Sequence, residues 1–298
     1  MERNLAASTE PFPSGVEREF SFTVQDFNRV RALIYRHAGI RLRESKQHMV
    51  YSRLARRLRA TGRSTCHDYL DFVERDEVEW QNFVNALTTN LTAFFREPHH
   101  FSILAEHLKN LASAEPQRVL NIWSAAVSSG EEAYSMAMTA VEVFGTLTPP
   151  VKILASDVDT QVLKTAEKGV FSRERVEKLS GAHLKRFFLQ GQGAQEGFVK
   201  IRPELRDLIT FRQSNLLTPN WQVTGPFDAI FCRNVMIYFD KPTQSKILER
   251  FVPLLRSRGL LFVGHSENFH HASKFFNACG KTVYRVAEFA EKRKPIDA

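Results

Sequence analysis

The 298-residue sequence predicts an α/β fold in which an N-terminal helical bundle precedes a doubly wound parallel sheet. Two observations lead to this prediction. Apolar residues recur at helical spacing up to about residue 88, whereas short apolar segments alternate with amphipathic ones after Asn90. Such alternation is typical of parallel strands joined by crossover helices. The length allows two domains.

The composition excludes several classes of protein. With 43% hydrophobic and 25% charged residues, the chain is typical of a globular protein and not of collagen, a coiled coil or a disordered chain. No apolar run approaches the ~20 residues that span a bilayer, and the first 20 residues lack the features of a secretory signal. Three scattered cysteines, Cys66, Cys232 and Cys279, form neither a disulfide framework nor a metal pair. We therefore expect a cytoplasmic location.

The N-terminal part is predicted to be a flexible tail over residues 1–20 and a helical domain over residues 21–88. Thr23 is the expected N-cap of the first helix, and Gly62 is expected to end the second. The other helices are expected at residues 66–74 and 78–87. Residues 29–63 hold eleven Lys and Arg residues and only one acid, Glu44, so this part predicts binding to something anionic. A solvated face is the alternative.

The second domain is expected over residues 89–298. Its strands are predicted at residues 119–123, 151–155, 209–213, 228–232 and 259–263, and its helices at residues 131–144, 160–168 and 243–255. The glycine-containing segment at about residues 171–203 interrupts this alternation, and we interpret it as a small β-rich insertion.

Ligands of a doubly wound sheet bind at the carboxyl ends of its strands. The loop after the first strand, SAAVSSGEE, has only Gly130 of the three glycines of a dinucleotide fingerprint and lacks the Gly-Lys-Ser/Thr ending of a phosphate loop. Glu131 and Glu132 disfavour an anion there and favour a cationic or neutral ligand. Asp157 ends the second strand, where an acid commonly accepts hydrogen bonds from ribose hydroxyls. Asp159 is explained as a helix N-cap.

Two further segments combine polar and aromatic residues. TTNLTAFFREPHHF at residues 88–101 places Asn90, Thr92 and Arg96 around a pair of phenylalanines, and FDAIFCRNVMIYFD at residues 227–240 ends a strand at Arg233 and Asn234. The pairs His99–His100 and His270–His271 lack acidic or cysteine partners at ligand spacing, so no metal site is expected.

These segments resemble the CheR family, the chemotaxis receptor glutamate methyltransferases, from about Phe22 to Tyr284. The resemblance lies in the blocks NLTAFFREPHHF, WSAAVSSGEEAYSMAM, ASDVDTQVL, SNLL, GPFDAIFCRNVMIYFDKPTQ and GLLFVGHSENF. It implies a helical N-terminal domain and a Rossmann-like S-adenosylmethionine-dependent methyltransferase domain with a small β-subdomain. Two positions depart from the family pattern. A small residue or Cys is usual at the position of Val127, and Pro is usual at the position of Ala133.

The resemblance also implies an activity: methyl transfer from S-adenosylmethionine to glutamate side chains of chemoreceptors, with S-adenosylhomocysteine as product. The cofactor-binding residues that it implies are Asn90, Thr92, Arg96, Glu132, Asp157, Asn215, Leu216, Arg233 and Asn234. Tyr238 matches the tyrosine near the transferred methyl group, so we expect Tyr238, Arg96 and Arg233 to be catalytic by aligning the substrate. A sulfonium ligand is cationic at sulfur and agrees with the two glutamates of the loop.

Two further surfaces are expected to meet the receptor. Arg53, Arg56, Arg57 and Arg59 are predicted to dock the acidic helical bundle of a chemoreceptor. Gly191, Gly193 and Gly197, in the stretch LQGQGAQEGFVKI, resemble a loop that tethers the C-terminal peptide of some receptors. Simple turn geometry is the alternative explanation for these glycines.

Two other classes of function compete with this interpretation. A nucleic-acid methyltransferase would use the basic patch to bind phosphate, but NVMIY lacks the prolines of the amino-methylating motif, so no nucleic acid is expected as partner. A binding module without catalysis is disfavoured by the presence of Asn90, Arg96, Asp157 and Tyr238. No membrane insertion is expected.

Overall fold

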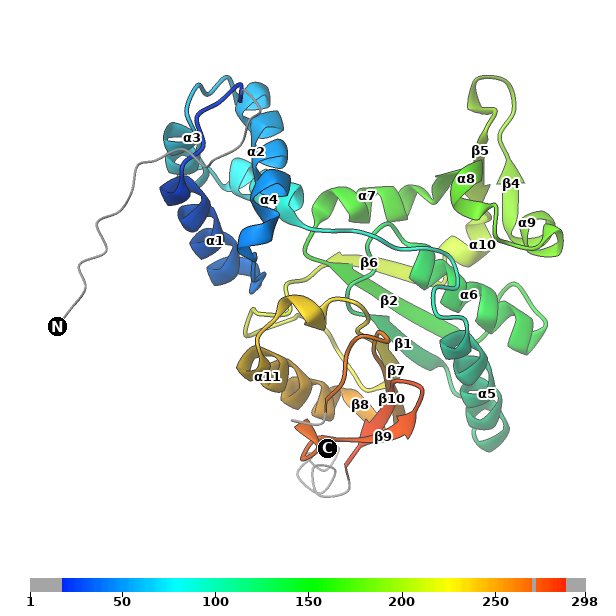
Figure 1. Cartoon of the computed structure of the whole chain (residues 1–298). Coiled ribbons are helices and arrows are strands. Elements are labelled where there is room, and N and C mark those ends of the chain that lie inside the picture. Colours follow the sequence, from blue (N-terminus) through cyan, green and yellow to red (C-terminus); the bar gives the residue numbers. More distant parts are fainter. Residues whose placement is uncertain (1–17, 270–271, 288–298) are drawn as a thin grey trace. The chain divides into compact units, whose positions relative to one another are not determined.

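The computed structural model describes residues 18–269 and 272–287, which form two compact units (Figure 1). The first unit extends to Thr89 and also contains Tyr238–Asp240, and the second comprises Asn90–Ile237 and the chain from Lys241 onwards. The tail expected over residues 1–20 lies outside the described residues except for its last three. In the described ranges, no helix is long and apolar enough to cross a membrane.

The first unit is a helical bundle, as the sequence predicts. Thr23 forms a capping box with Asp26, and Gly62 ends its helix at φ 67°. The start of the first helix and the end of the second therefore lie at the capping residues predicted from the sequence. The elements are α1 (Val24–Ala38), the 3₁₀ turn η1 (Glu44–Lys46), α2 (Gln47–Thr61), α3 (Cys66–Val73) and α4 (Glu77–Leu87).

The core of this bundle consists of apolar residues at helical spacing. Phe27, Val30 and Ile34 of α1 are fully or almost fully buried, as are Leu54 and Leu58 of α2. Residues 238–240 join the same unit, where the Tyr35 hydroxyl donates to Asp240 Oδ2 at 2.6 Å. The sequence pattern did not predict this return of the chain.

The second unit contains a seven-stranded sheet in the order β6-β2-β1-β7-β8-β10-β9. Five neighbouring strands, from β6 to β8, are parallel, and β10 and β9 are antiparallel. The main strands are β1 (Leu120–Ser124), β2 (Val151–Asp157), β6 (Ile209–Gln213), β7 (Phe227–Phe231) and β8 (Leu255–Phe262). The doubly wound sheet is thus confirmed. The final hairpin of β9 (Phe276–Gly280) and β10 (Val283–Val286) was missed.

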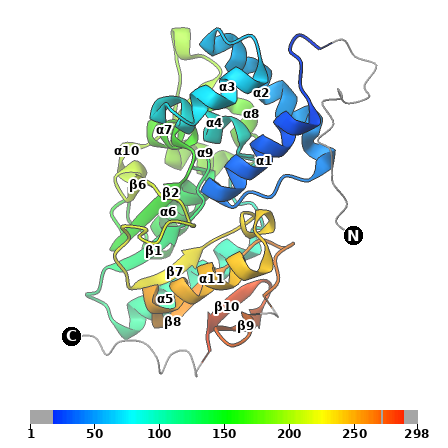
Figure 2. The ribbon, with the colours of Figure 1, turned by 90° about the vertical axis from the view of Figure 1, so that its left-hand side faces the viewer.

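Helices cover both faces of this sheet (Figures 1 and 2). Alternate residues of β1 point to opposite faces, so Ile122 belongs to the cluster with α5 (His99–Ala114) and α6 (Glu131–Phe144). Trp123 instead packs against Phe251 of α11 (Lys241–Phe251), with ring centroids 5.5 Å apart. Because both faces are covered, β1 is buried at every position except the half-buried Asn121, and β7 is buried at every position, rather than at alternate ones.

The predicted insertion is a separate three-stranded antiparallel sheet in the order β3-β5-β4. It follows α7 (Thr160–Lys168) and lies beyond β6 in the same unit (Figure 1). Its elements are β3 (Val170–Ser172), α8 (Arg173–Val176), α9 (Gly181–Phe187), β4 (Phe188–Gln190), the turn η2 (Gly193–Gln195), β5 (Phe198–Ile201) and α10 (Pro203–Arg206).

Candidate active site

The candidate site lies along the carboxyl edge of the four adjacent parallel strands β6, β2, β1 and β7. Each of these strands ends in, or is followed by, a residue singled out from the sequence: Asn215 after β6, Asp157 on β2, the loop to Glu132 after β1, and Arg233 after β7. Parallel strands place all these ends at one edge of the sheet, where ligands of such folds bind.

Asp157 is a buried carboxylate that accepts backbone hydrogen bonds on both oxygens. Oδ2 accepts from Ser128 N at 2.9 Å and Oδ1 from Asp159 N at 3.0 Å. Burial raises the pKa of Asp157 to about 6, although the two amides act against this rise. Among the described residues, no ion pair involves Asp157. Its buried charge therefore lacks a cation but keeps lone pairs for further donors.

Glu132 and Arg233 form a buried ion pair that joins the ends of β1 and β7. Arg233 NH1 donates to Glu132 Oε2 at 2.9 Å, and the Ser124 hydroxyl donates to Oε1 at 2.7 Å. Burial raises the pKa of Glu132, an effect that Arg233 partly offsets. The remaining Arg233 donor, Nε, is buried without a partner in the described structure.

The structure corrects the electrostatic argument made for the loop after β1. Glu131 is fully buried and pairs with Arg175 of the inserted subdomain, while Ser129 donates to its Oε2 at 2.8 Å. Both glutamates of the loop are therefore already paired with arginines. Their charges by themselves do not select a cationic ligand.

The segment before α5 runs beside this loop. Asn90 donates through Nδ2 to Asp159 Oδ2 at 2.8 Å, and its carbonyl accepts from the Ser128 hydroxyl at 3.1 Å. Asp159 also caps α7, as predicted, by accepting from Gln161 N at 2.9 Å. These contacts link residue 90 to the loops after both β1 and β2.

Arg96 is half-buried and donates from NH1 to Leu91 O at 2.7 Å. Its own carbonyl accepts from Arg233 NH2, so the two arginines predicted to be catalytic are neighbours. Phe95 and Glu97 flank Arg96 with φ of 50° and 58°, a conformation that non-glycine residues adopt only where surrounding contacts hold it. Phe95 N is held by the Ser135 hydroxyl at 2.9 Å.

For the other predicted site residues, the structure shows burial and contacts that shape the local backbone. Thr92 is half-buried, and Asn215 accepts from Leu217 N at 2.9 Å, which shapes the turn after β6. Leu216 is buried, and its carbonyl accepts from Trp221 Nε1 at 3.0 Å. Tyr238 belongs to the first unit, where its carbonyl accepts from Arg41 N at 3.1 Å. A role for its hydroxyl stays a prediction.

One cluster near the site has the composition of a metal site. Glu97, His99 and His100 bring their ligand atoms within 4.8 Å of one another, so the expectation that these histidines lack an acidic partner at ligand spacing was wrong. Arg233 lies 3.5 Å from Glu97 Oε2, and both histidines begin α5, whose N-terminus is positive. Both charges oppose a cation, and we assign no metal here. His270 and His271 lie outside the described residues.

The sequence analysis missed Ser128 and Glu97, because only their contacts in the folded structure connect them to the site. Ser128 has φ 55° and presents its amide to Asp157, and Glu97 contacts Arg233, Asn234 and His265. Burial tends to raise the pKa of Glu97, but Arg233 and His265 outweigh it and the pKa lies below its ordinary value. The block EPHH contained Glu97, but nothing in its spacing indicated these partners.

These residues fit a nucleoside ligand that carries hydroxyl donors. Asp157 offers two carboxylate oxygens without a neutralising cation, and Arg233 Nε is a buried donor without a partner in the described structure. An acid closing the second strand of a doubly wound sheet, beside a tight loop after the first, defines the class of Rossmann-like nucleotide- or S-adenosylmethionine-binding domains.

Comparison with known proteins identifies the family. Residues 90–285 match the model described as "CheR methyltransferase, SAM binding domain", and residues 25–88 match "CheR methyltransferase, all-alpha domain". The chain belongs to the CheR methyltransferase family. It is therefore an S-adenosylmethionine-dependent methyltransferase whose product is S-adenosylhomocysteine.

Relatives match along almost the whole chain. "Chemotaxis protein methyltransferase 2" of Pseudomonas aeruginosa is 52% identical over 280 residues, covering 94% of this chain and 99% of its own. "Chemotaxis protein methyltransferase" of Escherichia coli is 49% identical over 264 residues, covering 88% of this chain and 91% of its own. The sequence-based family assignment is confirmed.

The four arginines predicted to dock a receptor differ in their surroundings. Arg53 NH1 donates to Thr88 O at 2.6 Å, and Arg57 forms a two-point ion pair with the buried Glu79, with Nε 2.9 Å from Oε1. Arg53 therefore holds α2 to the end of α4, and Arg57 holds α2 to the first turn of α4. Arg56 and Arg59 are exposed, and Arg59 pairs with Glu19.

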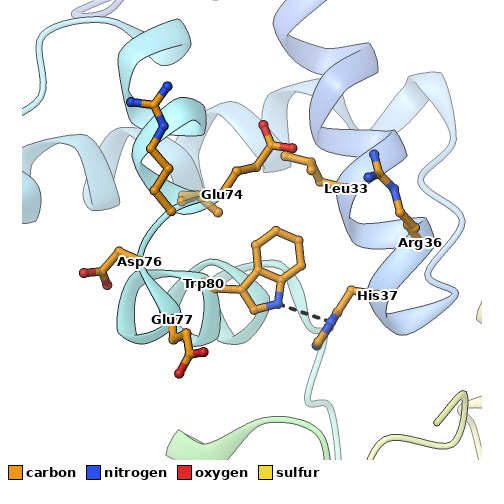
Figure 3. Close-up of a pocket in the computed structure, with 9 residues that line it drawn as sticks. Leu33, Arg36, His37, Glu74, Asp76, Glu77 and Trp80 are labelled. Atoms are coloured by element: carbon orange, nitrogen blue, oxygen red, sulfur yellow. Dashed lines mark hydrogen bonds between the residues drawn. The ribbon is translucent and has the colours of Figure 1, made fainter. Parts of the chain in front are cut away.

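The helical unit also contains a pocket of about 540 Å³ between α1 and the start of α4 (Figure 3). Trp80 lies in it and donates from Nε1 to His37 Nδ1 at 3.2 Å. Glu74, Asp76 and Glu77 share its walls with Arg36 and Arg75, so its charges nearly balance. No residue predicted for catalysis or docking lines it.

Asp157 provides a direct test of the cofactor site. We expect its ionised form to accept from two ribose hydroxyls, and its pKa of about 6 means that it becomes protonated as the pH falls below 6. We expect Asp157→Asn to weaken S-adenosylmethionine binding by roughly tenfold or more at pH 8, because charge-assisted hydrogen bonds are lost. We also expect wild-type affinity to fall with pH below about 6, whereas the Asn variant lacks this dependence. Calorimetry between pH 5.5 and 8 measures both effects, and equal profiles would contradict the assignment.

Proposed function

We propose that the protein transfers methyl groups to glutamate side chains of chemoreceptors, forming methyl esters, and that it acts in the cytoplasm. The observation that carries the site is the row of Asn215, Asp157, Glu132 and Arg233 along adjacent strand ends. The relatives named as chemotaxis methyltransferases support the receptor as substrate. The free cysteines Cys66, Cys232 and Cys279 fit a reducing compartment.

The reaction requires little acid–base chemistry from the chain. A glutamate with an ordinary pKa of about 4.3 is ionised at neutral pH, so the nucleophile needs no general base. S-adenosylmethionine supplies a methyl group on a sulfonium sulfur; the oxygen–carbon bond forms as the carbon–sulfur bond breaks. The chain must hold the acceptor carboxylate in line and exclude water, and such positioning can supply ~7–11 kcal/mol of the barrier.

Each predicted residue then has a defined task. Asp157 holds the ribose hydroxyls, and Asn215 and Leu216 lie in the turn after β6, where we place the adenine. Arg96, whose carbonyl is fixed by Arg233, orients a carboxylate. Arg233 is itself held by Glu132. Asn90, Thr92 and Asn234 complete the cofactor site, and Tyr238 aligns the acceptor oxygen.

The nature of the product tests this function. We expect label from methyl-labelled S-adenosylmethionine to enter a chemoreceptor fragment and to be released as methanol at alkaline pH, because esters hydrolyse there. Replacing the acceptor glutamates of the fragment by alanine provides the matched control and should abolish labelling. A label that survives alkali, or that enters DNA or RNA instead, would contradict the proposal.

We propose Arg56 and Arg59 of α2 as the docking surface for the acidic receptor helices. Both are exposed, whereas Arg53 and Arg57 are engaged in contacts within the helical unit. The pair of Arg59 with Glu19 is exposed to solvent, so we expect its loss to leave the fold intact.

Charge reversal distinguishes docking from a solvated face. We expect Arg56→Glu with Arg59→Glu to lower the methylation rate on receptors by about tenfold at low salt and to flatten its salt dependence. Affinity for S-adenosylmethionine should stay unchanged. The double variant Arg36→Glu with Arg75→Glu reverses two exposed charges at the pocket of Figure 3 and is the control. Equal losses in both variants would indicate a net-charge effect and reject a docking surface.

We also propose that the inserted subdomain tethers a C-terminal peptide of the receptor along β4. β4 is an edge strand, and its Leu189 is 42% exposed. An edge strand can accept a peptide as an added strand. The glycines have a role in the fold as well: a Cβ on Gly191 would lie 2.0 Å from Gln195 O, and Gly193 and Gly197 have φ of 56° and 87°.

Peptide binding tests the tether separately from catalysis. We expect calorimetry to detect binding of a receptor C-terminal peptide and Leu189→Asp to weaken it, with catalysis on untethered fragments unchanged, because a tether raises only the local concentration. Absence of binding for the C-termini of all receptors from the same cell would reject the tether.

A further inference from the structure

Glu267 is a buried carboxylate to which the sequence analysis gave no role. It is 4% exposed and follows β8 in the segment GHSENF. Burial raises its pKa, against the effect of several backbone amides that point at it. A buried carboxylate is costly unless it is well hydrogen-bonded, so these amides account for its presence.

The amides come from the turn that follows β7. Glu267 Oε2 accepts from Asn234 N at 2.9 Å, and Oε1 accepts from Ile237 N at 3.3 Å. Oε2 also accepts from Gly264 N at 2.5 Å, which ties the carboxylate to its own loop. One side chain therefore binds two separate points of the turn and the end of β8.

The turn requires such support. Asn234 has φ 58°, which is unfavourable for a residue with a Cβ. Gly264 lies against it so closely that a Cβ there would be 2.2 Å from Asn234 Nδ2. In addition, Gln244 Nε2 donates to Met236 O at 2.8 Å. The backbone of the turn is thus held on both its donor and its acceptor groups.

This backbone carries two residues of the cofactor site. Arg233 directs its guanidinium to Glu132 and Arg96 O, and Asn234 places Nδ2 3.4 Å from Glu97 Oε1. If the amides of Asn234 and Ile237 lost their acceptor, the positive φ of Asn234 would no longer be maintained. Both side chains would then leave the geometry described above.

We infer that Glu267 is a positioning residue for cofactor binding, which fixes the turn of residues 233–237 and through it the side chains of Arg233 and Asn234. This inference rests on the proposed assignment of Arg233 and Asn234 to the cofactor. Glu267 itself acts through the backbone and not through contact with the reacting atoms.

The test compares two buried carboxylates at opposite ends of β7. Glu267→Gln removes the charge and points an amide group at other amides, so we expect S-adenosylmethionine affinity to fall by roughly tenfold or more. Asp228→Asn is the control, since Asp228 is 1% exposed and accepts from Asn121 N at 2.8 Å and from Arg118 NH1 at 2.8 Å, but at the start of the strand. We expect Asp228→Asn to lower the melting temperature while leaving cofactor affinity unchanged.

Hydrogen exchange adds a local readout. In Glu267→Gln, we expect faster amide exchange in the peptide covering residues 233–238, with unchanged exchange around Asp157. Should the Gln variant fail to fold, Glu267→Asp keeps the charge on a shorter side chain and is expected to show the same changes to a smaller extent. Wild-type affinity and exchange in the folded Glu267 variant would overturn the inference, as would equal affinity losses in Asp228→Asn.

Asn234→Ala tests the assignment of Asn234 to the cofactor, on which this inference rests, separately from the inference itself. We expect Asn234→Ala to weaken cofactor binding directly. If it does so while Glu267→Gln binds normally, only the positioning role fails. If Asn234→Ala binds normally, the assignment of Asn234 to the cofactor is wrong, and the positioning role is overturned unless Glu267→Gln still weakens binding through Arg233.

Discussion

The buried ion pair between Arg233 and Glu132 is the interaction on which the candidate site depends. It connects the residue after β7 to the first turn of α6, and its arginine also holds the carbonyl of Arg96. Removing one partner of such a pair typically costs ~3–5 kcal/mol, because the other charge stays buried. Three segments far apart in the sequence are therefore fixed by one guanidinium.

Backbone amides rather than lysines or arginines hold two other buried acids, Asp157 and Glu267. Asp157 accepts from the amides of Ser128 and Asp159, and Glu267 accepts from those of Asn234, Ile237 and Gly264. Amides fix the geometry of a carboxylate without cancelling its charge. Asp157 therefore remains able to bind hydroxyl donors, and Glu267 can shape a turn.

Some arginines of the helical unit form contacts within the fold, whereas others are exposed to solvent. Of the four arginines of α2 considered for docking, Arg53 closes the end of α4 and Arg57 neutralises the buried Glu79. Arg56 and Arg59 are exposed. A charge count along the sequence overestimates a docking surface, because it cannot separate arginines that satisfy buried acceptors from those that face solvent.

The sequence by itself determined the α/β class, the helix termini at Thr23, Gly62 and Asp159, and the family, because periodicity, capping and motifs are local properties. Only the tertiary structure decided that Glu131 pairs with Arg175, that residues 238–240 join the helical unit, and that Glu267 binds the turn after β7. These contacts join residues at least about 30 positions apart in the chain, and no spacing rule relates such partners. They form only when the sheet brings its strand ends together.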